Sequence, residues 1–247
     1  MLKNSQLVVI PVFNEERTIT SVIEKVSLYT KADILVIDDG STDSSWDKLK
    51  KQKRAITLRH PRNMGYGKTL IDGFLYAIEH TYKALVTIDC DEQHEPQKIP
   101  EFFNELEEAD ILSGSRYLFD FSDNNSPPPE RKKINLAITE IINRLTKFNL
   151  TDSFCGFKAY RVEALKKLNI TEPGYGMPLQ LWIQAWKETL SIKEKAVARI
   201  YKDMTRSFGE DLDNSERRLK YYKSIIKKET ELRRHEKQAG PTELIFS

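Results

Sequence analysis

The sequence predicts an α/β fold in which helices flank a mostly parallel sheet, followed by a helical tail. The main observation is an alternation along the first half of the chain, in which an apolar run is followed by a polar loop and then by a helical pattern. Four runs follow this rule, at residues 7–12, 34–37, 55–58 and 84–88. Runs that are apolar almost throughout are typical of strands buried on both faces of a parallel sheet.

Helices are expected where apolar residues recur every three or four positions. Past Ser113–Arg116 the alternation stops, and the second half of the chain is predicted to hold helices, a polar loop around Asp152 and one further strand. The expected helices lie at residues 19–26, 70–78, 96–106, 131–148 and 179–187, and the expected strand at 196–201.

Two units are predicted, a main domain over residues 1–209 and a charged amphipathic tail over 210–247. Between Glu210 and Lys237 the tail has nine basic and seven acidic residues, with apolar residues among them. One interpretation is a helix that packs an apolar stripe on the main domain. The other is a helix that touches a membrane surface, which the near balance of charge makes weaker.

The charge balance excludes a protein that binds nucleic acid through bulk charge. The 247 residues include 39 Lys and Arg against 37 Asp and Glu, a formal net charge of +2. No apolar run approaches the roughly 20 residues that cross a bilayer. The chain also passes directly into a predicted strand, so no signal peptide is expected. We therefore expect a soluble, cytoplasmic protein. Cys90 and Cys155 are the two cysteines, too few for a disulfide framework or a zinc site.

Acidic residues gather where the predicted parallel strands end. Glu15, Asp38, Asp39, Asp89 and Asp91 all follow such strands. Ligands of open parallel sheets bind at this edge, and five carboxylates there would repel one another unless a cation or hydrogen-bond donors lay among them. A divalent metal ion that holds a substrate diphosphate fits this pattern.

Asp89-Cys90-Asp91 is the strongest candidate for the metal ligands, because both carboxylates can reach one side of an ion and Gln93 adds a neutral oxygen. Arg116, Arg131 and Arg206 lie in loop-like or weakly charged segments, which suits clamps on phosphate oxygens. Gly67-Lys68-Thr69 resembles the end of a phosphate-binding loop, but Arg62 stands where that motif needs glycine.

Together these segments resemble the family 2 glycosyltransferases of the GT-A fold. Within that family the chain is most similar to the polyprenyl-phosphate sugar transferases, through Gln93–Pro96 and Asp152–Arg161. The other matching segments are Val9–Glu15, Val36–Asp43, Asn63–Gly67, Asp89–Asp91 and Gly114–Tyr117.

The resemblance implies an inverting transfer of mannose or glucose to a polyprenyl phosphate, from the donor GDP-mannose or UDP-glucose. It implies Mg²⁺ or Mn²⁺ as cofactor. It also implies that the protein reaches the lipid acceptor at the inner face of the membrane. It implies a metal held by Asp89, Asp91 and Gln93. Asp89, Asp91, Arg116 and Arg206 are the implied catalytic residues, with the arginines facing phosphates. The implied donor-binding residues are Pro11, Phe13, Glu15, Ile37, Asp39, Cys90 and Arg131.

Two features depart from the family pattern. Gln180 stands in a segment where relatives often have an acidic residue, which favours a phosphate acceptor because a hydroxyl acceptor normally needs a base. The chain has a charged tail after Gly209 rather than membrane spans. Two alternatives remain open: transfer to a glycan hydroxyl, and a module that binds nucleotide sugars without catalysis.

Overall fold

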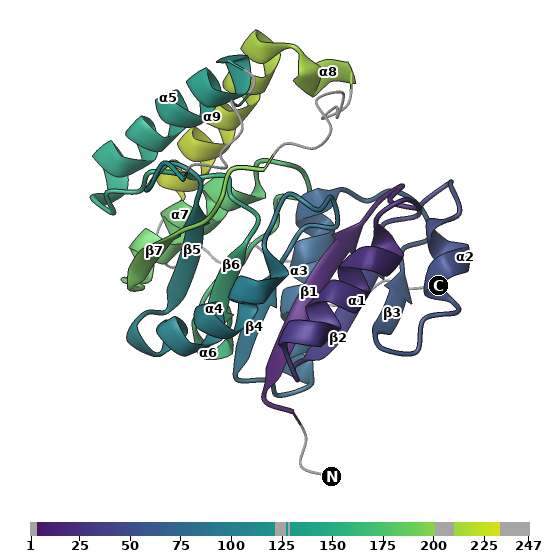
Figure 1. Ribbon diagram of the computed structural model, residues 1–247. Coiled ribbons are helices and arrows are strands. Elements are labelled where there is room, and N and C mark those ends of the chain that lie inside the picture. The colour runs from purple at the N-terminus through teal and green to yellow at the C-terminus, as the bar shows by residue number, and fades with distance from the viewer. Residues whose placement is uncertain (1–3, 122–126, 128, 201–209, 233–247) are drawn as a thin grey trace.

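The computed structural model describes residues 4–121, 127, 129–200 and 210–232. Within them, seven strands form one sheet in the order β3-β2-β1-β4-β6-β5-β7 (Figure 1). β6 is antiparallel to its neighbours β4 and β5, whereas the other pairs are parallel. The strands are Gln6–Val12 (β1), Asp33–Asp38 (β2), Ile56–Arg59 (β3), Ala84–Thr87 (β4), Ile111–Ser115 (β5), Lys158–Arg161 (β6) and Ile192–Ala196 (β7).

Helices cover both faces of this sheet, and α9 lies against α5 and α7 (Figure 1). The α-helices are Ile19–Tyr29 (α1), Ser45–Leu49 (α2), Tyr66–Glu79 (α3), Ile99–Glu105 (α4), Pro129–Thr146 (α5), Val162–Leu165 (α6), Met177–Lys187 (α7), Glu210–Asp213 (α8) and Ser215–Glu231 (α9). Short 3₁₀ turns at Pro96–Lys98 (η1) and Leu106–Glu108 (η2) flank α4.

The central strands separate two hydrophobic cores. Successive side chains of a strand point to opposite faces, so Leu7 and Val9 join one core while Val8 and Ile10 join the other. The first core includes side chains of α3, α5, α6, α7 and α9, and the second includes those of α1, α2 and α4. Burial on both faces explains why these strands are apolar at nearly every position.

The structure confirms the first four predicted strands and the mostly parallel sheet, but it corrects the second half of the chain. The strand expected over residues 196–201 is wrong, because β7 is Ile192–Ala196 and no strand is present over 197–200. β5 and the antiparallel β6 were not predicted. β7 is an edge strand with an exposed lysine, Lys193, and a second lysine, Lys195, that pairs with glutamates of α4, and it therefore lacks the apolar run that revealed the central strands.

The tail packs on the main domain as far as the structure describes it. Tyr222, Ile225 and Ile226 of α9 are buried in the core shared with α5 and α7, which confirms a packed amphipathic helix over Ser215–Glu231. The boundary at residue 209 stays a prediction, and residues 233–247 lie outside the described part. None of the described helices is both long enough and apolar enough to span a bilayer.

A buried polar network links the ends of β2 and β3 to α3. Asp39 Oδ1 lies 2.6 Å from Nδ1 of His60, and Nε2 of His60 lies 2.9 Å from Oδ2 of Asp72. The Asp39 carboxylate also accepts hydrogen bonds from the backbone N–H groups of Met64 and Gly65, at 2.8 and 2.9 Å. Burial alone would lower the pKa of His60, but the bonds to both carboxylates and their charges raise it to about 9. At neutral pH, His60 is therefore a buried cation.

We predict that the protein loses stability as the pH rises from about 6.5 through about 9. The pKa of His60 is about 9 in the folded protein against an ordinary 6.5, so the stabilisation is complete below 6.5 and is lost as the pH rises through 9. The corresponding change in the free energy of unfolding is on the order of 3 kcal/mol. Urea unfolding at about pH 6 and about pH 9.5 measures it. His60→Gln should remove the difference and His80→Gln should retain it; a native protein equally stable at both pH values contradicts the prediction.

Candidate active site

Asp89 follows β4 and is held at the carboxyl edge of the sheet by hydrogen bonds to both its oxygens. Its Oδ1 accepts a hydrogen bond from the hydroxyl of Tyr66 in α3 at 2.9 Å, and its Oδ2 lies 3.0 Å from Nε2 of His94. Burial alone would raise the pKa of Asp89, but His94, Tyr66 and the charge of Lys158 hold this pKa below its ordinary value. Asp89 is therefore ionised at neutral pH, and 27% of its side chain is exposed.

Gly156 packs directly against this carboxylate. A Cβ atom at position 156 would lie 2.2 Å from Oδ2 of Asp89, far inside van der Waals contact. The Gly156 carbonyl accepts a 2.6 Å hydrogen bond from Oγ1 of Thr87, the last residue of β4. The close approach of backbone and carboxylate therefore requires glycine at this position.

Asp91 and Gln93 lie in the loop just after Asp89. Oδ1 of Asp91 accepts a hydrogen bond from the backbone N–H of Gln93 at 3.0 Å, which closes a tight turn. Among the residues that the structure describes, no three or more His, Cys, Asp or Glu side chains are grouped to hold a metal ion. Two carboxylates still fit Mg²⁺ or Mn²⁺, because such ions are commonly held by one or two carboxylates together with substrate phosphates and water.

Three of the five carboxylates at the strand ends meet donors of the protein itself, the alternative to a cation that the sequence left open. Asp38 is fully buried, its Oδ2 lies 3.1 Å from Nε of Arg59, and burial raises its pKa. Asp39 belongs to the network with the buried histidine. Glu15 accepts a hydrogen bond from the Thr18 hydroxyl at 2.9 Å, at the start of α1. These three carboxylates have partners within the protein and need no shared cation.

The residues predicted to contact the donor are divided between the sheet edge and the interior. Phe13 is 43% exposed and Glu15 is half-buried, both just beyond β1. Pro11 and Ile37 are buried and are paired in register across β1 and β2. Cys90 is buried in the core beside α1. The side chains of Pro11, Ile37 and Cys90 are therefore buried, and the donor contacts predicted for them stay predictions.

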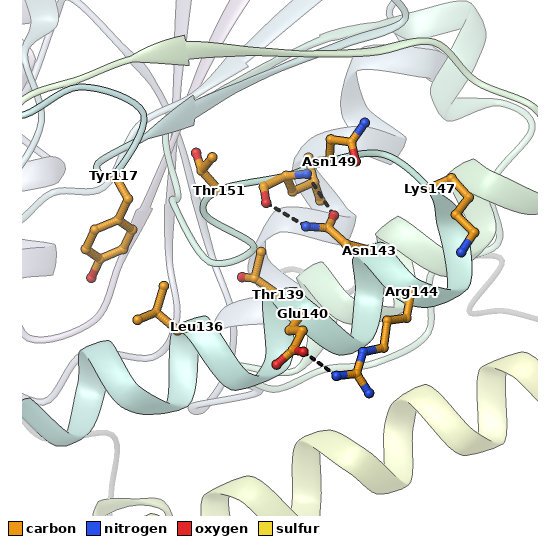
Figure 2. Close-up of a pocket in the computed structure, with 10 residues that line it drawn as sticks. Tyr117, Leu136, Thr139, Glu140, Asn143, Arg144, Lys147, Asn149 and Thr151 are labelled. Carbon is orange, nitrogen blue, oxygen red and sulfur yellow. Dashed lines mark hydrogen bonds and ion pairs between the residues drawn. The ribbon is translucent and has the colours of Figure 1, made fainter.

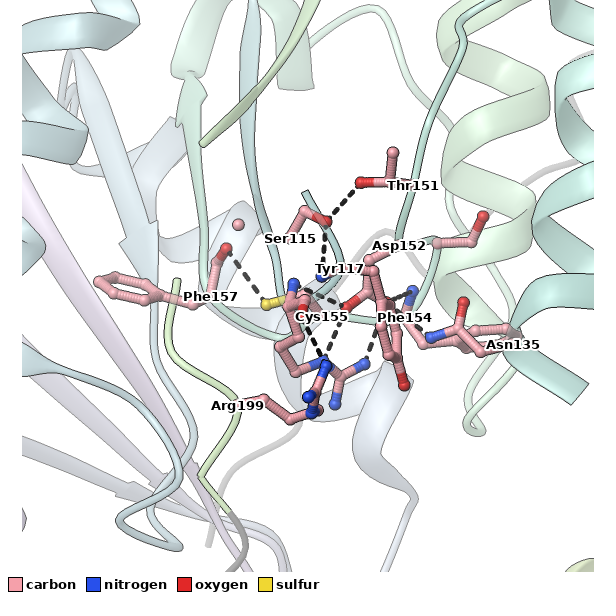
Figure 3. Close-up of polar contacts among 12 residues, drawn as sticks. Ser115, Tyr117, Asn135, Thr151, Asp152, Phe154, Cys155, Phe157 and Arg199 are labelled. Carbon is pink, nitrogen blue, oxygen red and sulfur yellow. Dashed lines mark hydrogen bonds and ion pairs between the residues drawn. The ribbon is translucent and has the colours of Figure 1, made fainter. Parts of the chain in front are cut away.

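Arg116 forms a bidentate ion pair with Asp152, whose surroundings are drawn in Figure 3. Nε of Arg116 lies 2.7 Å from Oδ2 and Nη2 lies 3.0 Å from Oδ1, and Asn135 donates to Oδ1 at 2.7 Å. Burial would raise the pKa of Asp152, but Arg116 and Asn135 lower it to about 2. One edge of the guanidinium is thus occupied by a buried carboxylate, and the role of Arg116 at a phosphate stays a prediction.

The structure leaves open whether the three arginines predicted as phosphate clamps lie together. Arg131 lies in the first turn of α5. Burial lowers the pKa of Arg218 in α9, and the positive charge of Arg131 lowers this pKa further. Arg131 therefore lies near α9. Arg206 lies outside the described residues. The structure adds Arg199, which donates to the backbone carbonyl of Arg116 at 3.3 Å. The predicted roles of Arg131 and Arg206 are therefore not tested here by geometry.

Several residues around Asp89 were missed as site residues. Tyr66 and His94 belong to segments that carried the family resemblance, and that signal could have identified them. Lys158 of β6 is 2% exposed, and its Nζ lies 5.4 Å from the centre of the Trp182 ring. Burial lowers the pKa of Lys158. Lys158 also belongs to a segment that carried the resemblance, but because β6 was not predicted, its position near Asp89 was not.

A groove of about 630 Å³ runs along α5 beside the segment that follows this helix. Figure 2 shows Tyr117 and Leu136 towards one end and Arg144 and Lys147 towards the other. Tyr117 is the sequence neighbour of Arg116, so the groove begins next to the Arg116–Asp152 pair. It offers apolar and basic contacts in one continuous depression.

We predict that Gly156→Ala weakens metal binding without unfolding the protein. The added Cβ must displace either Asp89 or the backbone, and disturbing the partners of a metal ligand typically costs about 10- to 100-fold in affinity. Calorimetric titration of Mn²⁺ in the presence of UDP or GDP measures the loss, and circular dichroism checks the fold. A folded variant that binds Mn²⁺ as tightly as the native protein contradicts the prediction.

Known proteins share both sequence and fold with this chain. A sequence profile described as Glycosyl transferase family 2 matches residues 7–169. An undecaprenyl-phosphate mannosyltransferase of Micrococcus luteus is 26% identical over 209 residues, 81% of this chain and 86% of that protein. A UDP-N-acetylglucosamine–dolichyl-phosphate N-acetylglucosaminyltransferase of Methanococcus voltae is 27% identical over 221 residues, 81% of this chain and 88% of that protein.

Among solved structures, glucosyl-3-phosphoglycerate synthase from Mycobacterium tuberculosis, crystallised with Mn²⁺, UDP and glucosyl-3-phosphoglycerate, has a TM-score of 0.72. The two chains are 20% identical, and the match covers 93% of this chain and 81% of that one. This likeness shows a shared GT-A fold. The family match spans β1 to β6, including Asp89, Asp91 and Gly156. The chain is therefore a glycosyltransferase that belongs to family 2.

Proposed function

We propose that this glycosyltransferase moves a sugar from a nucleoside diphosphate donor to a polyprenyl phosphate, with inversion at the anomeric carbon. The observation that carries the proposal is the ionised Asp89, bonded to Tyr66 and His94 at the edge where β4 ends. Support for the acceptor comes from two relatives whose names specify undecaprenyl phosphate and dolichyl phosphate. The donors GDP-mannose and UDP-glucose are the first to test.

Asp89 and Asp91, with the side-chain oxygen of Gln93, would hold Mg²⁺ or Mn²⁺. The close packing of Gly156 supports this assignment, because it restricts the position of a carboxylate that His94, Tyr66 and Lys158 keep ionised at the sheet edge. When bound, the ion would stabilise the negative charge that develops on the departing nucleoside diphosphate. Tyr66 and His94 keep the carboxylate oriented and so reduce the reorganisation needed on binding.

A phosphate acceptor suits the environment of Gln180. A phosphomonoester is largely ionised near neutral pH, its second pKa being about 6, so it can attack without a protein base. Gln180 is 6% exposed, and its Oε1 accepts hydrogen bonds from the backbone N–H groups of Thr171 and Glu172, both at 2.8 Å. The side chain at this position is therefore committed to the interior and supplies no base for a hydroxyl acceptor.

The outward face of α9 suits contact with the anionic membrane surface in which a polyprenyl phosphate is embedded. Glu229 of this helix is buried, so it does not offset the basic residues outside. The exposed charged residues of α9 are Arg217, Lys220, Lys223, Lys227 and Lys228 against Glu216 and Glu231. Basic residues near an anionic bilayer contribute about 1 kcal/mol each. We therefore propose a peripheral protein that meets the membrane through α9.

We predict that labelled GDP-mannose or UDP-glucose, with Mg²⁺ or Mn²⁺ and polyprenyl phosphate, yields a labelled product that partitions into organic solvent. Asp91→Ala should lower the rate by roughly 100-fold or more, since loss of one transition-state charge interaction commonly costs that much. Asp47→Ala, which removes an exposed carboxylate in α2, is the matched control and should retain the native rate.

The distribution of label separates the alternatives. Label that remains in water as a glycan, with no lipid product, would indicate a hydroxyl acceptor and contradict the proposal. Donor binding without turnover across the acceptor panel would indicate a non-catalytic module. An Asp91→Ala variant with full activity would contradict the metal role of this carboxylate.

We predict that the protein binds vesicles containing phosphatidylglycerol. The double variant with Lys223→Glu and Lys227→Glu should bind them roughly 10-fold more weakly or worse, because each change reverses a charge on the outward face of α9. Raising the salt concentration should weaken it further. Cosedimentation is the measurement. Lys51→Glu with Lys53→Glu, at exposed positions after α2, is the matched control and should bind more tightly than the α9 variant. Equal binding by both variants contradicts the proposed face.

A further inference from the structure

The C-terminal helix α9 makes polar contacts with the interior as well as apolar ones. Glu229 is 4% exposed, and it lies between two glutamines of α7. Oε2 of Glu229 accepts a hydrogen bond from Nε2 of Gln180, and Oε1 accepts one from Nε2 of Gln184, both at 2.9 Å. The Lys187 side chain donates to the backbone carbonyls of Glu229 and Leu232. A buried carboxylate with these partners ties α9 firmly to α7.

The same two glutamines hold the backbone of the loop that precedes α7. Oε1 of Gln180 binds the N–H groups of Thr171 and Glu172, and Oε1 of Gln184 accepts from the N–H of Asn169 at 2.7 Å. Each glutamine thus joins Glu229 on one side to loop backbone on the other. The amide nitrogens also donate to this loop, Gln180 to Oγ1 of Thr171 and Gln184 to the carbonyl of Asn169. Removing the carboxylate would leave one N–H of each glutamine without its acceptor, which is costly for the buried Gln180.

A second contact from α9 reaches the same loop through Tyr221. Its hydroxyl donates to Oε1 of Glu172 at 2.6 Å, and the same oxygen accepts the N–H of Gly174 at 3.0 Å. A Cβ at Gly176 would lie 2.0 Å from Cδ1 of Ile225 in α9. The loop over residues 169–176 is therefore packed closely against α9, and a side chain at position 176 would have to displace the end of Ile225.

The opposite side of the 169–176 loop contacts the start of α3. The N–H of Lys68 donates to the Pro173 carbonyl at 3.0 Å. The ring of Tyr175 stacks on that of Tyr66, with centroids 5.6 Å apart and planes inclined by 16°. The Tyr66 hydroxyl is the donor to Oδ1 of Asp89. A continuous series of contacts therefore runs from α9 through the loop to the carboxylate at the sheet edge.

We infer that α9 is a positioning element of the active site, with Glu229 and Tyr221 as its positioning residues. They fix the 169–176 loop, and the loop holds Tyr66 in the orientation in which it bonds to Asp89. The tail is then part of the catalytic unit and not an appendage. The inference rests on the proposed function only for the metal and donor role of Asp89, since the order of the loop can be measured without any ligand.

Hydrogen exchange of the full-length protein, followed by mass spectrometry, tests the first step. Glu229→Ala should accelerate amide exchange over residues 169–176 by roughly 10-fold or more, because each glutamine loses the Glu229 oxygen that fixes its side chain. Glu231→Ala is the matched control, two positions along the same helix with its side chain 65% exposed, and should leave the loop unchanged. Glu229→Gln keeps one acceptor oxygen and should give an intermediate rate.

The affinity for Mn²⁺ in the presence of UDP or GDP tests whether the order of the 169–176 loop acts on Asp89. Glu229→Ala should weaken it by roughly 10-fold, the lower end of the cost of disturbing groups that orient a metal ligand, and Glu231→Ala should not. If Glu229→Ala fails to fold, Tyr221→Phe removes only the hydroxyl bond to Glu172. The double variant with Tyr221→Phe and Tyr66→Phe should lose less affinity for Mn²⁺ than the product of the losses in the two single variants. The two residues act through one series of contacts, so their effects should not multiply.

Three results decide the inference. Unchanged loop exchange in Glu229→Ala, or in Tyr221→Phe where the alanine variant does not fold, would overturn it. Faster loop exchange with unchanged affinity for Mn²⁺ and nucleotide would also overturn it, since the loop would then not act on Asp89. A native protein that binds neither nucleotide with Mn²⁺ would instead contradict the proposed function, while the exchange rates would still decide whether α9 orders the loop.

Discussion

The site depends on keeping one carboxylate ionised at the end of a buried strand. Asp89 is largely removed from water, and its charge is compatible with that position only because Tyr66, His94 and the nearby charge of Lys158 stabilise it. These groups come from α3, from the loop before η1 and from β6. The relative placement of these elements on the sheet is thus constrained by a single ionised group, which links the fold to its chemistry.

Sequence patterns could predict the part of the fold in which strands are covered on both faces. β1, β2 and β4 are central and almost wholly apolar, so their positions were clear. β7 could not be found this way, because it is an edge strand whose Lys193 and Lys195 pair with glutamates of α4 and η2. β6 has four residues and includes a buried lysine, which no apolar pattern reveals.

The candidate site was predictable in position but not in its internal partners. The ends of neighbouring parallel strands meet at one edge, and Asp89 and Asp91 therefore had to lie there. Their contacts could not be derived, because Gly156 lies far along the chain and reaches Asp89 only through the antiparallel return of β6. The partners of Asp38 and Asp39 are Arg59 and His60 at the end of the neighbouring strand β3, and this pairing within the protein removed the need for a cation among five carboxylates.

The tail shows why a count of charges along a segment is a poor guide to what a partner meets. Nine basic and seven acidic residues between positions 210 and 237 look nearly neutral. In the folded chain Glu229 faces inward and bonds to two glutamines, so its charge serves the contact with α7. The outward face of α9 is left with more basic than acidic side chains. One amphipathic helix can therefore present a basic surface to an anionic membrane while its buried carboxylate orders the loop next to the active site.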